Sequence, residues 1–412
     1  MENTNAYLRI GTVYYKVVKK PLASGDKVEL LLLWSVECIR QDHGKSFLST
    51  IPRYDGFCLV PAHLNYQRKI ENFYNRYSPF AHEPKAGYPK QILMFLNHVF
   101  GEQLEQGLDY FKILLLYPTQ ILPILCLVSR ERNTGKTTFL NFCKAIFGDN
   151  MTINSNEDFR SNFNAEWASK LIIGVDETFL DKKEDSERIK NLSTSRYYKI
   201  EAKGQDRQEI EFFGKFILCT NNEDNFIQIE ASEIRYWIRR LPPLTTDQRN
   251  LLADLKNEIP FFIHYLIERP FTSQPSTRMW FRPEQIATTA LKHIKRYNRN
   301  RLETEMAQIL LHIIDTKETA QMVCFCISDM QDWLQKKGIH HRDIASIRKI
   351  LQQEWNLKPA DNSNSYLQYR FGTDGTIYEF MQKGRFYSIE NKQVLRLNNP
   401  DDFDDNHIIQ RE

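Results

Sequence analysis

A loop between two apolar segments carries the residue types of a phosphate-binding site. Residues 130–138 read R-E-R-N-T-G-K-T-T; they follow the apolar run Ile124 to Val128 and precede a helical pattern over Phe139 to Phe147. A strand, a loop ending in Gly-Lys-Thr and a helix form the P-loop arrangement, in which backbone N–H groups at the helix start surround the β-phosphate. The residues expected to hold a nucleotide are Asn133, Thr134, Gly135, Lys136, Thr137 and Thr138.

Two side chains of this loop have distinct expected roles. Lys136 would neutralise charge on the β- and γ-phosphates, and the Thr137 hydroxyl would hold Mg²⁺, so ATP and Mg²⁺ are the expected cofactors. The pattern G-x-x-x-x-G-K-[ST] is incomplete, because Arg130 stands where the first glycine belongs. Glycine permits backbone conformations that cost other residues energy. Taken alone, the loop fits a nucleotide site and an ordinary surface turn equally well.

A second apolar run ends in a pair of carboxylates. Residues 170–177 read K-L-I-I-G-V-D-E, which favours a strand buried on both faces of a parallel sheet. Such sheets bind ligands at the carboxyl ends of their strands. Asp176 would therefore lie near the Mg²⁺, directly or through water, and Glu177 would activate the attacking water as general base. The alternative is a strand followed by a solvated acidic turn.

Two further segments carry polar groups suited to a phosphate site. The buried-strand pattern K-F-I-L-C-T-N-N places Asn221 near its end, where it would orient water or contact the γ-phosphate; asparagine is also a common turn former. The segment E-A-S-E-I-R-Y-W-I-R-R-L contains Arg235, Arg239 and Arg240 around an aromatic pair. A guanidinium suits developing phosphoryl charge, and a neighbouring subunit can supply it. Surface salt bridges are the alternative role for these arginines.

Residues 197–213 predict a β-hairpin with a charged tip. Apolar and polar residues alternate imperfectly along the segment, and a turn is expected at Lys203-Gly204-Gln205-Asp206. A cationic tip can hold a nucleic-acid strand by its phosphates, with Lys203 as the expected contact and Lys199 and Arg207 in support. The alternative is a solvated hairpin whose charges keep a strand edge soluble.

The order of these segments resembles that of superfamily 3 helicases, an AAA+-related class found in viruses, phages and mobile elements. The resemblance rests on N-T-G-K-T, the strand ending D-E, the lysine-bearing hairpin, the strand ending T-N and R-Y-W, and it covers roughly Tyr66 to Arg301. More narrowly, the chain resembles the helicase part of poxvirus-type and virulence-associated-E-type primase–helicase proteins. Residues 156–164 and 201–222 are especially similar to bacterial mobile-element members.

The resemblance implies an ATP hydrolase that acts as a replicative-type DNA helicase. Subunits would form a homo-oligomeric ring, expected to be a hexamer, in which Arg235 of one subunit completes the ATP site of the next. Lys203 would follow one strand of single-stranded or forked DNA. The chain is too short to include the primase domain that often precedes such a helicase, so a separate primase or replication protein is an expected partner. The alternative is an ATP-gated DNA-binding initiator or loader without processive unwinding.

The expected fold class is α/β, with a P-loop AAA+-like ATPase core around a central parallel sheet. Strand patterns at Tyr7 to Val18 and Lys27 to Trp34 predict a β-rich N-terminal module. After Leu302 the order helix, strand, helix, helix and β-ribbon predicts a winged-helix-like domain that contacts DNA or docks a protein. Within it, Ser328 with Gln331 predicts a helix capping box.

These patterns give a set of expected boundaries. The ranges are 1–61 for the β-rich accessory module, 62–120 for a helical segment that could form an oligomerisation collar, 121–272 for the ATPase core and its lid helices, 273–301 for a linker and basic helix, 302–397 for the winged-helix-like domain and 398–412 for an acidic tail.

Composition limits the partners and the compartment. The 412 residues allow two or three domains, and the formal net charge of only +3 means that any nucleic-acid surface must be local. The seven cysteines form no C-x-x-C pair, which favours free thiols over disulfides or zinc ligands. The sequence shows no secretory signal and no apolar run long enough to cross a membrane, so we expect a cytoplasmic protein without a membrane partner.

Overall fold

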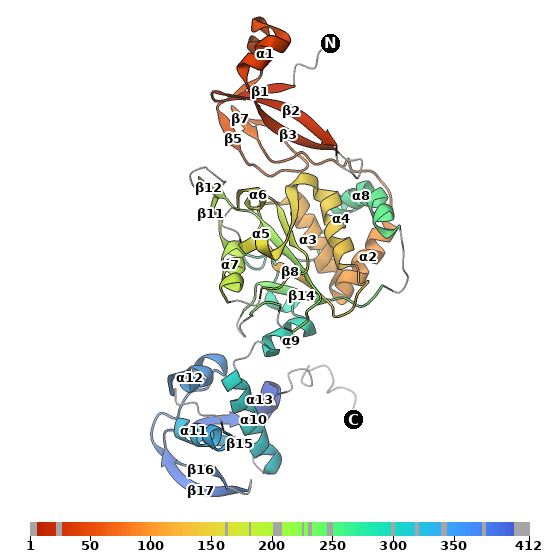
Figure 1. Ribbon diagram of the computed structural model, residues 1–412. Coiled ribbons are helices and arrows are strands. Elements are labelled where there is room, and N and C mark those ends of the chain that lie inside the picture. The colour runs from red at the N-terminus through yellow and green to blue at the C-terminus, as the bar shows by residue number, and fades with distance from the viewer. Residues whose placement is uncertain are drawn as a thin grey trace. The chain divides into compact units, whose positions relative to one another are not determined.

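The computed structural model describes residues 6–21, 27–160, 164–180, 183–200, 208–224, 226–229, 233–244, 250–297, 301–317, 321–338, 344–372 and 376–398. The chain divides into two units. The first contains residues 1–227 and 235–287, and the second contains residues 228–234 and 288–412. Figure 1 labels the elements of both units.

A parallel sheet of five strands lies at the centre of the first unit. Its strands are β8 (Ile124–Val128), β9 (Met151–Asn154), β10 (Ile172–Val175), β13 (Lys215–Thr220) and β14 (Tyr236–Arg240). They are ordered β14-β8-β13-β10-β9, and every neighbouring pair is parallel. β8, β10 and β13 are buried along their whole length, as continuous apolar runs predict. The predicted α/β core with a central parallel sheet is confirmed.

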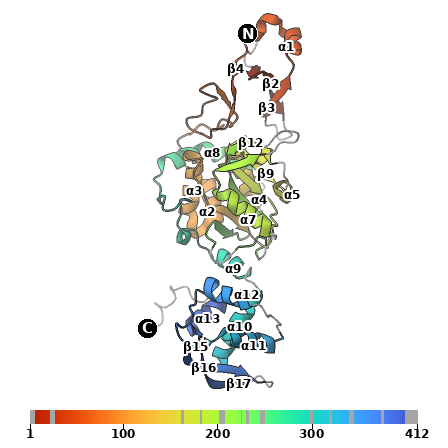
Figure 2. The same ribbon diagram turned by 90° about the vertical axis from the view of Figure 1, so that its left-hand side faces the viewer.

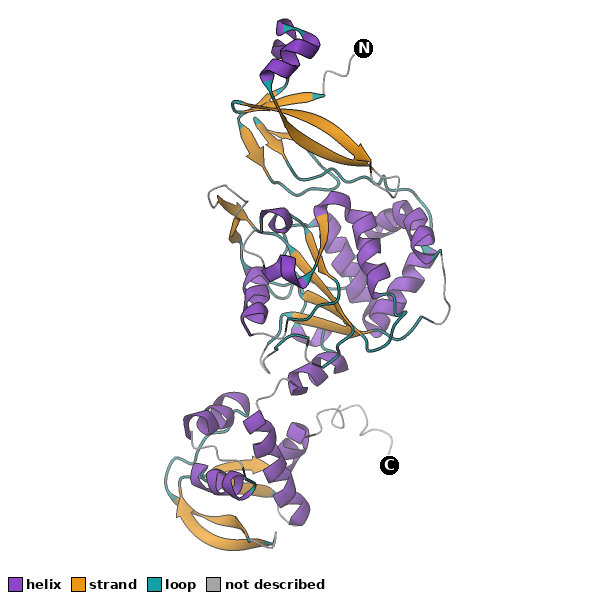
Figure 3. Ribbon diagram, in the orientation of Figure 1, coloured by secondary structure: helices purple, strands orange, loops and turns teal. Residues whose placement is uncertain are grey.

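Helices lie on both sides of this sheet (Figure 3). One group packs into a single apolar core and consists of α2 (Lys90–Phe100), α3 (Leu104–Leu116), α4 (Lys136–Phe147) and α8 (Leu251–Glu268). The other group consists of α5 (Asn156–Arg160), α6 (Ala165–Ala168) and α7 (Lys183–Thr194). α8 continues through Pro260 as one helix. The other helices of the first group support α4, which begins at Lys136 within the candidate phosphate-binding sequence.

A buried carboxylate joins α3 to the chain that follows α8. Asp109 has no exposed surface. It accepts hydrogen bonds from the backbone N–H groups of Thr272 and Ser273 at 3.0 and 2.7 Å and from their hydroxyls at 2.9 and 2.6 Å. Arg269 pairs with it at 2.6 Å. Because a buried charge without partners is costly, this set of contacts fixes how α3 and α8 meet.

A buried lysine lies at the base of a two-stranded hairpin formed by β11 (Tyr197–Ile200) and β12 (Gln208–Glu211). Lys215 donates a hydrogen bond to the Pro118 carbonyl and, at 2.6 Å, another to the Phe213 carbonyl. Burial lowers the pKa of Lys215 to about 7. These bonds connect the end of the hairpin to the loop between α3 and β8.

Two small sheets make up the N-terminal region, which Figure 2 shows from the side. The first has the order β3-β2-β1-β4 and the second the order β5-β7-β6. Their elements are β1 (Tyr7–Ile10), β2 (Val13–Pro21), β3 (Lys27–Trp34), α1 (Val36–His43), the 3₁₀ turn η1 (Lys45–Ser49), β4 (Arg53–Tyr54), β5 (Gly56–Cys58), β6 (Lys69–Ile70) and β7 (Phe73–Asn75).

The N-terminal region differs from its expectation in two respects. The stretch Tyr7 to Val18, expected to be β-rich, is a hairpin of two strands, because the chain turns at Gly11, whose φ of +55° favours glycine. β structure also continues to Asn75, past the expected boundary at residue 61, and the first helix of the segment expected to be helical begins at Lys90.

The second unit contains helices and short antiparallel strands. They are α9 (Thr289–Tyr297), α10 (Arg301–Thr316), β15 (Met322–Phe325), α11 (Ile327–Lys336), α12 (Ile344–Lys349) with its π-helical continuation (Ile350–Glu354), β16 (Asn364–Phe371), β17 (Ile377–Gly384), β18 (Tyr387–Glu390) and α13 (Asn391–Asn398). From α10 to the β16–β17 ribbon, the element order is the one expected from the sequence.

Two details of the second unit differ from the sequence prediction. The capping box of α11 uses Cys326 and Asp329, so the helix starts at Ile327 and not after Ser328. Asp329 is buried and also accepts a hydrogen bond from the Tyr366 hydroxyl at 2.6 Å, a tertiary contact that local sequence does not reveal. α13, which follows β18, was not expected.

Candidate nucleotide-binding site

Three neighbouring strands end at the same edge of the sheet and carry the predicted site residues there. β13 lies between β8 and β10, and all three run parallel. The candidate phosphate-binding sequence follows β8, Asp176 and Glu177 follow β10, and Asn221 follows β13. Their proximity therefore results from the strand order, as expected for ligands at the carboxyl ends of parallel strands.

The loop after β8 has the backbone of a helix-opening turn. Gly135 precedes α4 with a φ of +87°, and Asn133 also has a positive φ, +56°. The Leu244 N–H donates to the Asn133 carbonyl at 2.9 Å, and the ring of His98 lies 3.0 Å from the Thr134 carbonyl. The first turn of α4 therefore presents its backbone N–H groups next to a loop that distant segments hold in shape.

Lys136 is almost buried within this loop. Its ammonium donates to the Thr134 hydroxyl at 2.9 Å, and its side chain is only 8% exposed. Burial lowers the pKa of Lys136, and the nearby Cys219, Asp176 and Glu223 act in the opposite direction. An anionic phosphate at this position would favour the charged ammonium further.

The Thr137 and Asp176 side chains meet directly. Thr137 Oγ1 donates to Asp176 Oδ2 at 3.2 Å, which joins α4 to the end of β10. A hydroxyl and a carboxylate are suitable ligands for Mg²⁺, which usually keeps several waters and adds phosphate oxygens. In the described parts of the chain, no group of three or more His, Cys, Asp or Glu side chains forms a separate metal site.

Glu177 is exposed and has an unusual backbone conformation. Its φ is +51°, which is uncommon outside glycine, and its N–H donates to Asp176 Oδ1 at 3.1 Å. Asn156 holds this turn in place, because its amide donates to the Glu177 carbonyl at 3.1 Å and accepts from the Phe179 N–H at 3.0 Å. The sequence did not single out Asn156. The available signal was its position just after β9, the strand beside β10.

Arg130 is held by acidic residues that follow β13. Its backbone N–H donates to Glu223 Oε1 at 2.9 Å, and its guanidinium contacts both Asp224 oxygens at 2.9 Å. Glu223 is buried and also accepts from Arg240 Nε at 3.1 Å. Arg130 is not among the described residues with a positive φ, so its position does not require glycine. Sequence analysis missed these acidic partners, since they lie far away in the chain.

The three candidate arginines occupy different environments. The Arg235 carbonyl accepts a hydrogen bond from the Ile124 N–H at 2.9 Å, so Arg235 lies at the start of β14. Lys136 and Asp176 follow the carboxyl ends of their strands, so Arg235 is at the opposite end of the strands from them. Arg239 is buried and pairs with Glu102 at 2.5 Å. Arg240 ends β14 beside the loop, where Glu223 contacts it. The structure therefore does not bring Arg235 to the site of its own chain.

The predicted nucleic-acid contacts are only partly within the described residues. Lys199 is exposed on β11 opposite Glu209 of β12. Lys203 and Arg207 lie outside the residues that the structure describes. The hairpin itself is present, and its cationic tip remains an expectation from the sequence.

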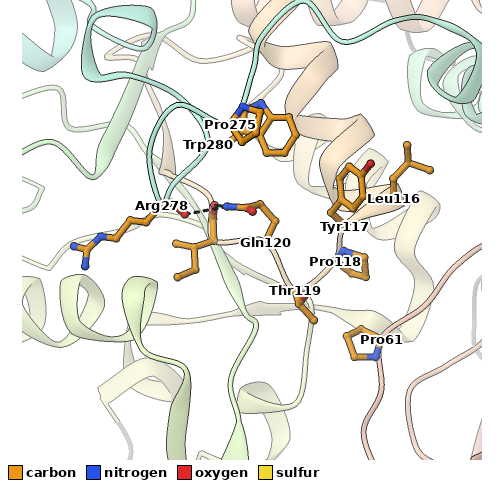
Figure 4. Close-up of a pocket in the computed structure, with 10 residues that line it drawn as sticks. Pro61, Leu116, Tyr117, Pro118, Thr119, Gln120, Pro275, Arg278 and Trp280 are labelled. Atoms are coloured by element: carbon orange, nitrogen blue, oxygen red, sulfur yellow. Dashed lines mark hydrogen bonds between the residues drawn. The ribbon is translucent and has the colours of Figure 1, made fainter.

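A pocket of about 700 Å³ opens on the other side of the first unit (Figure 4). It lies between the chain that leads into β8 and the loop around Arg278, and Trp280 forms part of its wall. The Gln120 amide donates to the carbonyls of Ile121 and Arg278, each at 2.9 Å, which joins the two loops. Residues after the strand ends do not line this pocket, so it is separate from the candidate nucleotide site.

All seven cysteines are free thiols, and Cys126, Cys143 and Cys219 are buried in the core. None of the helices in the described ranges combines the length and apolar character that a membrane span requires.

These features define the first unit as a P-loop-like α/β domain, and comparisons with known proteins agree with this fold. A model described as "Family of unknown function (DUF5906)" matches residues 127–240, from β8 to the end of β14. No curated protein matches the chain.

Solved structures of the NrS-1 C-terminal region are similar to almost the whole chain. One apo structure has a TM-score of 0.62 at 13% identity, covering 92% of this chain and 95% of that chain. Another, an A form, has a TM-score of 0.60 at 13% identity, covering 93% and 95%. At this identity the similarity shows a shared fold and not a shared activity. A JCV helicase structure matches 53% of this chain and 64% of that chain at 13% identity, with a TM-score of 0.31 that is too low to support an argument.

Gly135 provides a test of the loop, with Gly148 as a matched control. A Cβ on Gly135 would lie 3.1 Å from the Phe95 ring, whereas Gly148 has a φ of +54° and nothing within 4 Å. Both glycines have positive φ, so each change to alanine should cost about 1–3 kcal/mol of backbone strain. Only Gly135→Ala should weaken nucleotide affinity, by about tenfold or more, measured with a fluorescent ADP analogue. Equal affinities for the two variants would contradict this assignment of the loop.

Proposed function

We propose that the chain is an ATP-driven motor on nucleic acid, and more narrowly a superfamily 3-type DNA helicase of a phage or mobile element. The observation that carries the proposal is the convergence of Lys136, Thr137 and Asp176 at one sheet edge, with Thr137 Oγ1 3.2 Å from Asp176 Oδ2. The motif order that resembles superfamily 3 helicases supports the nucleic-acid part of the proposal.

In this proposal the residues at the sheet edge divide the hydrolysis of ATP between them. The N–H groups at the start of α4 bind the phosphates, and Lys136 balances their charge. Mg²⁺ held by Thr137 and Asp176 would offset charge on the β- and γ-phosphates. Glu177 takes a proton from the attacking water as the water oxygen bonds to the γ-phosphorus, and the bond to the β–γ bridging oxygen breaks to release ADP. Asn221 orients that water or the γ-phosphate.

The position of Arg235 supports assembly into a ring. β14 separates Arg235 from Arg240 by about 16 Å at the usual rise of a strand, so Arg235 is out of reach of phosphates bound by its own loop. Placed at an intersubunit contact, it would complete the site of a neighbour. Arg239 suits this role less well, because it is buried against Glu102 in its own chain. A closed ring, proposed to be a hexamer, satisfies such head-to-tail contacts.

The hairpin of β11 and β12 would transmit the ATP cycle to a DNA strand. Its base is connected to the sheet through Lys215, and β13 runs from that lysine to Thr220, which precedes Asn221 of the candidate site. Lys203 at the tip, with Lys199 and Arg207, would contact the phosphates of single-stranded or forked DNA. A separate primase or replication protein is the proposed partner of such a motor.

A mixing experiment tests whether Arg235 acts in a neighbouring subunit. Lys136→Ala and Arg235→Ala should each lose about a thousandfold in ATPase rate, since both remove phosphate-stabilising charge. Mixed in equal amounts, the two proteins should regain activity, because about a quarter of the head-to-tail interfaces would then combine an intact lysine with an intact arginine. The measurement is phosphate release before and after mixing. A mixture as inactive as its components would exclude the arrangement in trans.

Lys203→Ala distinguishes a motor from an ATP-gated initiator. The variant should retain basal ATPase but lose strand displacement on a forked duplex, because its grip on the phosphates is removed. Lys85→Ala, which removes an exposed lysine elsewhere in the first unit, serves as the control and should unwind normally. If Lys203→Ala unwinds like the control, the hairpin is not the DNA contact. ATP-dependent binding by the wild type without any displacement would favour the initiator.

A further inference from the structure

The first 76 residues of this protein carry a net positive charge. This region contains eleven Lys and Arg residues against seven Asp and Glu residues, a net charge of +4, whereas the whole chain has +3. The remaining residues are therefore slightly acidic as a group. A net positive charge on a small β-rich region favours an anionic partner for that region.

Most of these cations have no carboxylate partner. Over residues 6–21 and 27–76, the ion pairs are Arg40 with Glu37 and Arg68 with Glu29. Exposed cations without such a pair include Lys19, Lys20 and Arg53. Charges that are not neutralised within the protein remain available to an external anion.

One face of the first N-terminal sheet carries aromatic and cationic side chains in a single row. The strand registers place Trp34 of β3 opposite Tyr14 of β2, Tyr14 opposite Arg9 of β1, and Arg9 opposite Arg53 of β4. Because directly paired residues point to the same face, these four side chains cross the whole sheet. Neighbouring strands are about 4.8 Å apart, so the row is about 14 Å long.

The aromatic rings of this row are in contact with cations. Lys16 Nζ lies 4.5 Å from the centre of the Trp34 ring, and the Arg9 guanidinium lies 5.8 Å from the centre of the Tyr14 ring. Both rings are half-buried, because they pack at the margin of the apolar cluster under α1 and η1. They are thus held in position by the fold while part of each remains accessible.

We propose that this face binds single-stranded nucleic acid. Trp34 and Tyr14 would stack on unpaired bases, and Arg9, Arg53 and Lys16 would contact the phosphates on either side. Stacking needs bases whose faces are free, which a duplex does not offer, and a flat sheet face does not enter a groove as a helix does. The aromatic side chains distinguish the surface from a purely basic patch suited to a lipid headgroup or an acidic protein.

This site goes beyond the proposed motor, because it uses neither ATP nor the β11–β12 hairpin. It would give each subunit a second contact with a strand, independent of the nucleotide state. Two linked contacts raise the effective concentration of the strand at each, so the N-terminal site would keep the substrate close to the motor.

The test is a fluorescence anisotropy titration of a labelled 30-nucleotide DNA without nucleotide, using the full chain. The variant Lys16→Glu, Lys20→Glu, Arg53→Glu reverses three cations whose strand positions place them on the same face as the row. Its control, Lys85→Glu, Lys90→Glu, Lys256→Glu, makes the same change in net charge at exposed positions of the first unit. The first variant should bind at least about tenfold more weakly. The slope of its log binding constant against log salt concentration should be smaller in magnitude by about two. The control should stay within about twofold to threefold of wild type.

Further measurements distinguish the possible ligands and test whether binding at this site is independent of ATP hydrolysis. Single-stranded DNA or RNA should bind more tightly than a duplex of the same length or vesicles containing phosphatidylserine. DNA should quench tryptophan fluorescence less in Trp34→Phe than in wild type. Lys136→Ala should bind the oligonucleotide like wild type even though its ATPase is lost. Equal losses in the two triple variants, or equal binding of duplex or vesicles, would overturn the proposal.

Discussion

The parallel pairing of β13 with β8 on one side and β10 on the other determines the arrangement of the candidate site in the first unit. This pairing brings to one edge three chain segments that are separated by about forty residues each, and it places Thr137 within hydrogen-bonding distance of Asp176. Each strand is buried on both faces, so a shift in register would expose apolar side chains and is strongly disfavoured. The positions of the polar residues at the strand ends are therefore determined by the core and not by contacts among themselves.

The loop departs from the usual P-loop sequence at a position where the fold supplies other support. Arg130 replaces a glycine, yet its backbone is not in the left-handed region, and Glu223 binds both its N–H and its side chain. Glu223 also contacts Arg240 at the end of β14, so the ends of β8, β13 and β14 are joined through one buried carboxylate. The positions with positive φ are instead Asn133 and Gly135, on either side of Thr134 and just before α4.

The sequence predicted the parts of this molecule whose signal is local. Continuous apolar runs identified the buried strands, and Gly-Lys-Thr identified the start of α4. The contacts that stabilise the site were not predictable in this way, because Arg130 with Glu223 and Asn156 with Glu177 join residues that are distant in sequence. The cap at Cys326 was missed for a related reason, since Tyr366 and the α11 backbone together determine the position of Asp329. Gly11 divides the β-rich stretch Tyr7 to Val18 into two strands, because one turn residue outweighs the alternation around it.

Calorimetric titration of ADP, with and without Mg²⁺, tests the central claim that these strand ends form one nucleotide site. The account predicts that wild type binds ADP and that Mg²⁺ strengthens binding. Lys136→Ala should weaken binding by at least about tenfold, or 1.4 kcal/mol, under both conditions. Asp176→Ala should bind like wild type without Mg²⁺ and lose only the strengthening by Mg²⁺. A wild-type protein that binds no nucleotide, or a Lys136→Ala variant that binds as wild type does, would contradict the account.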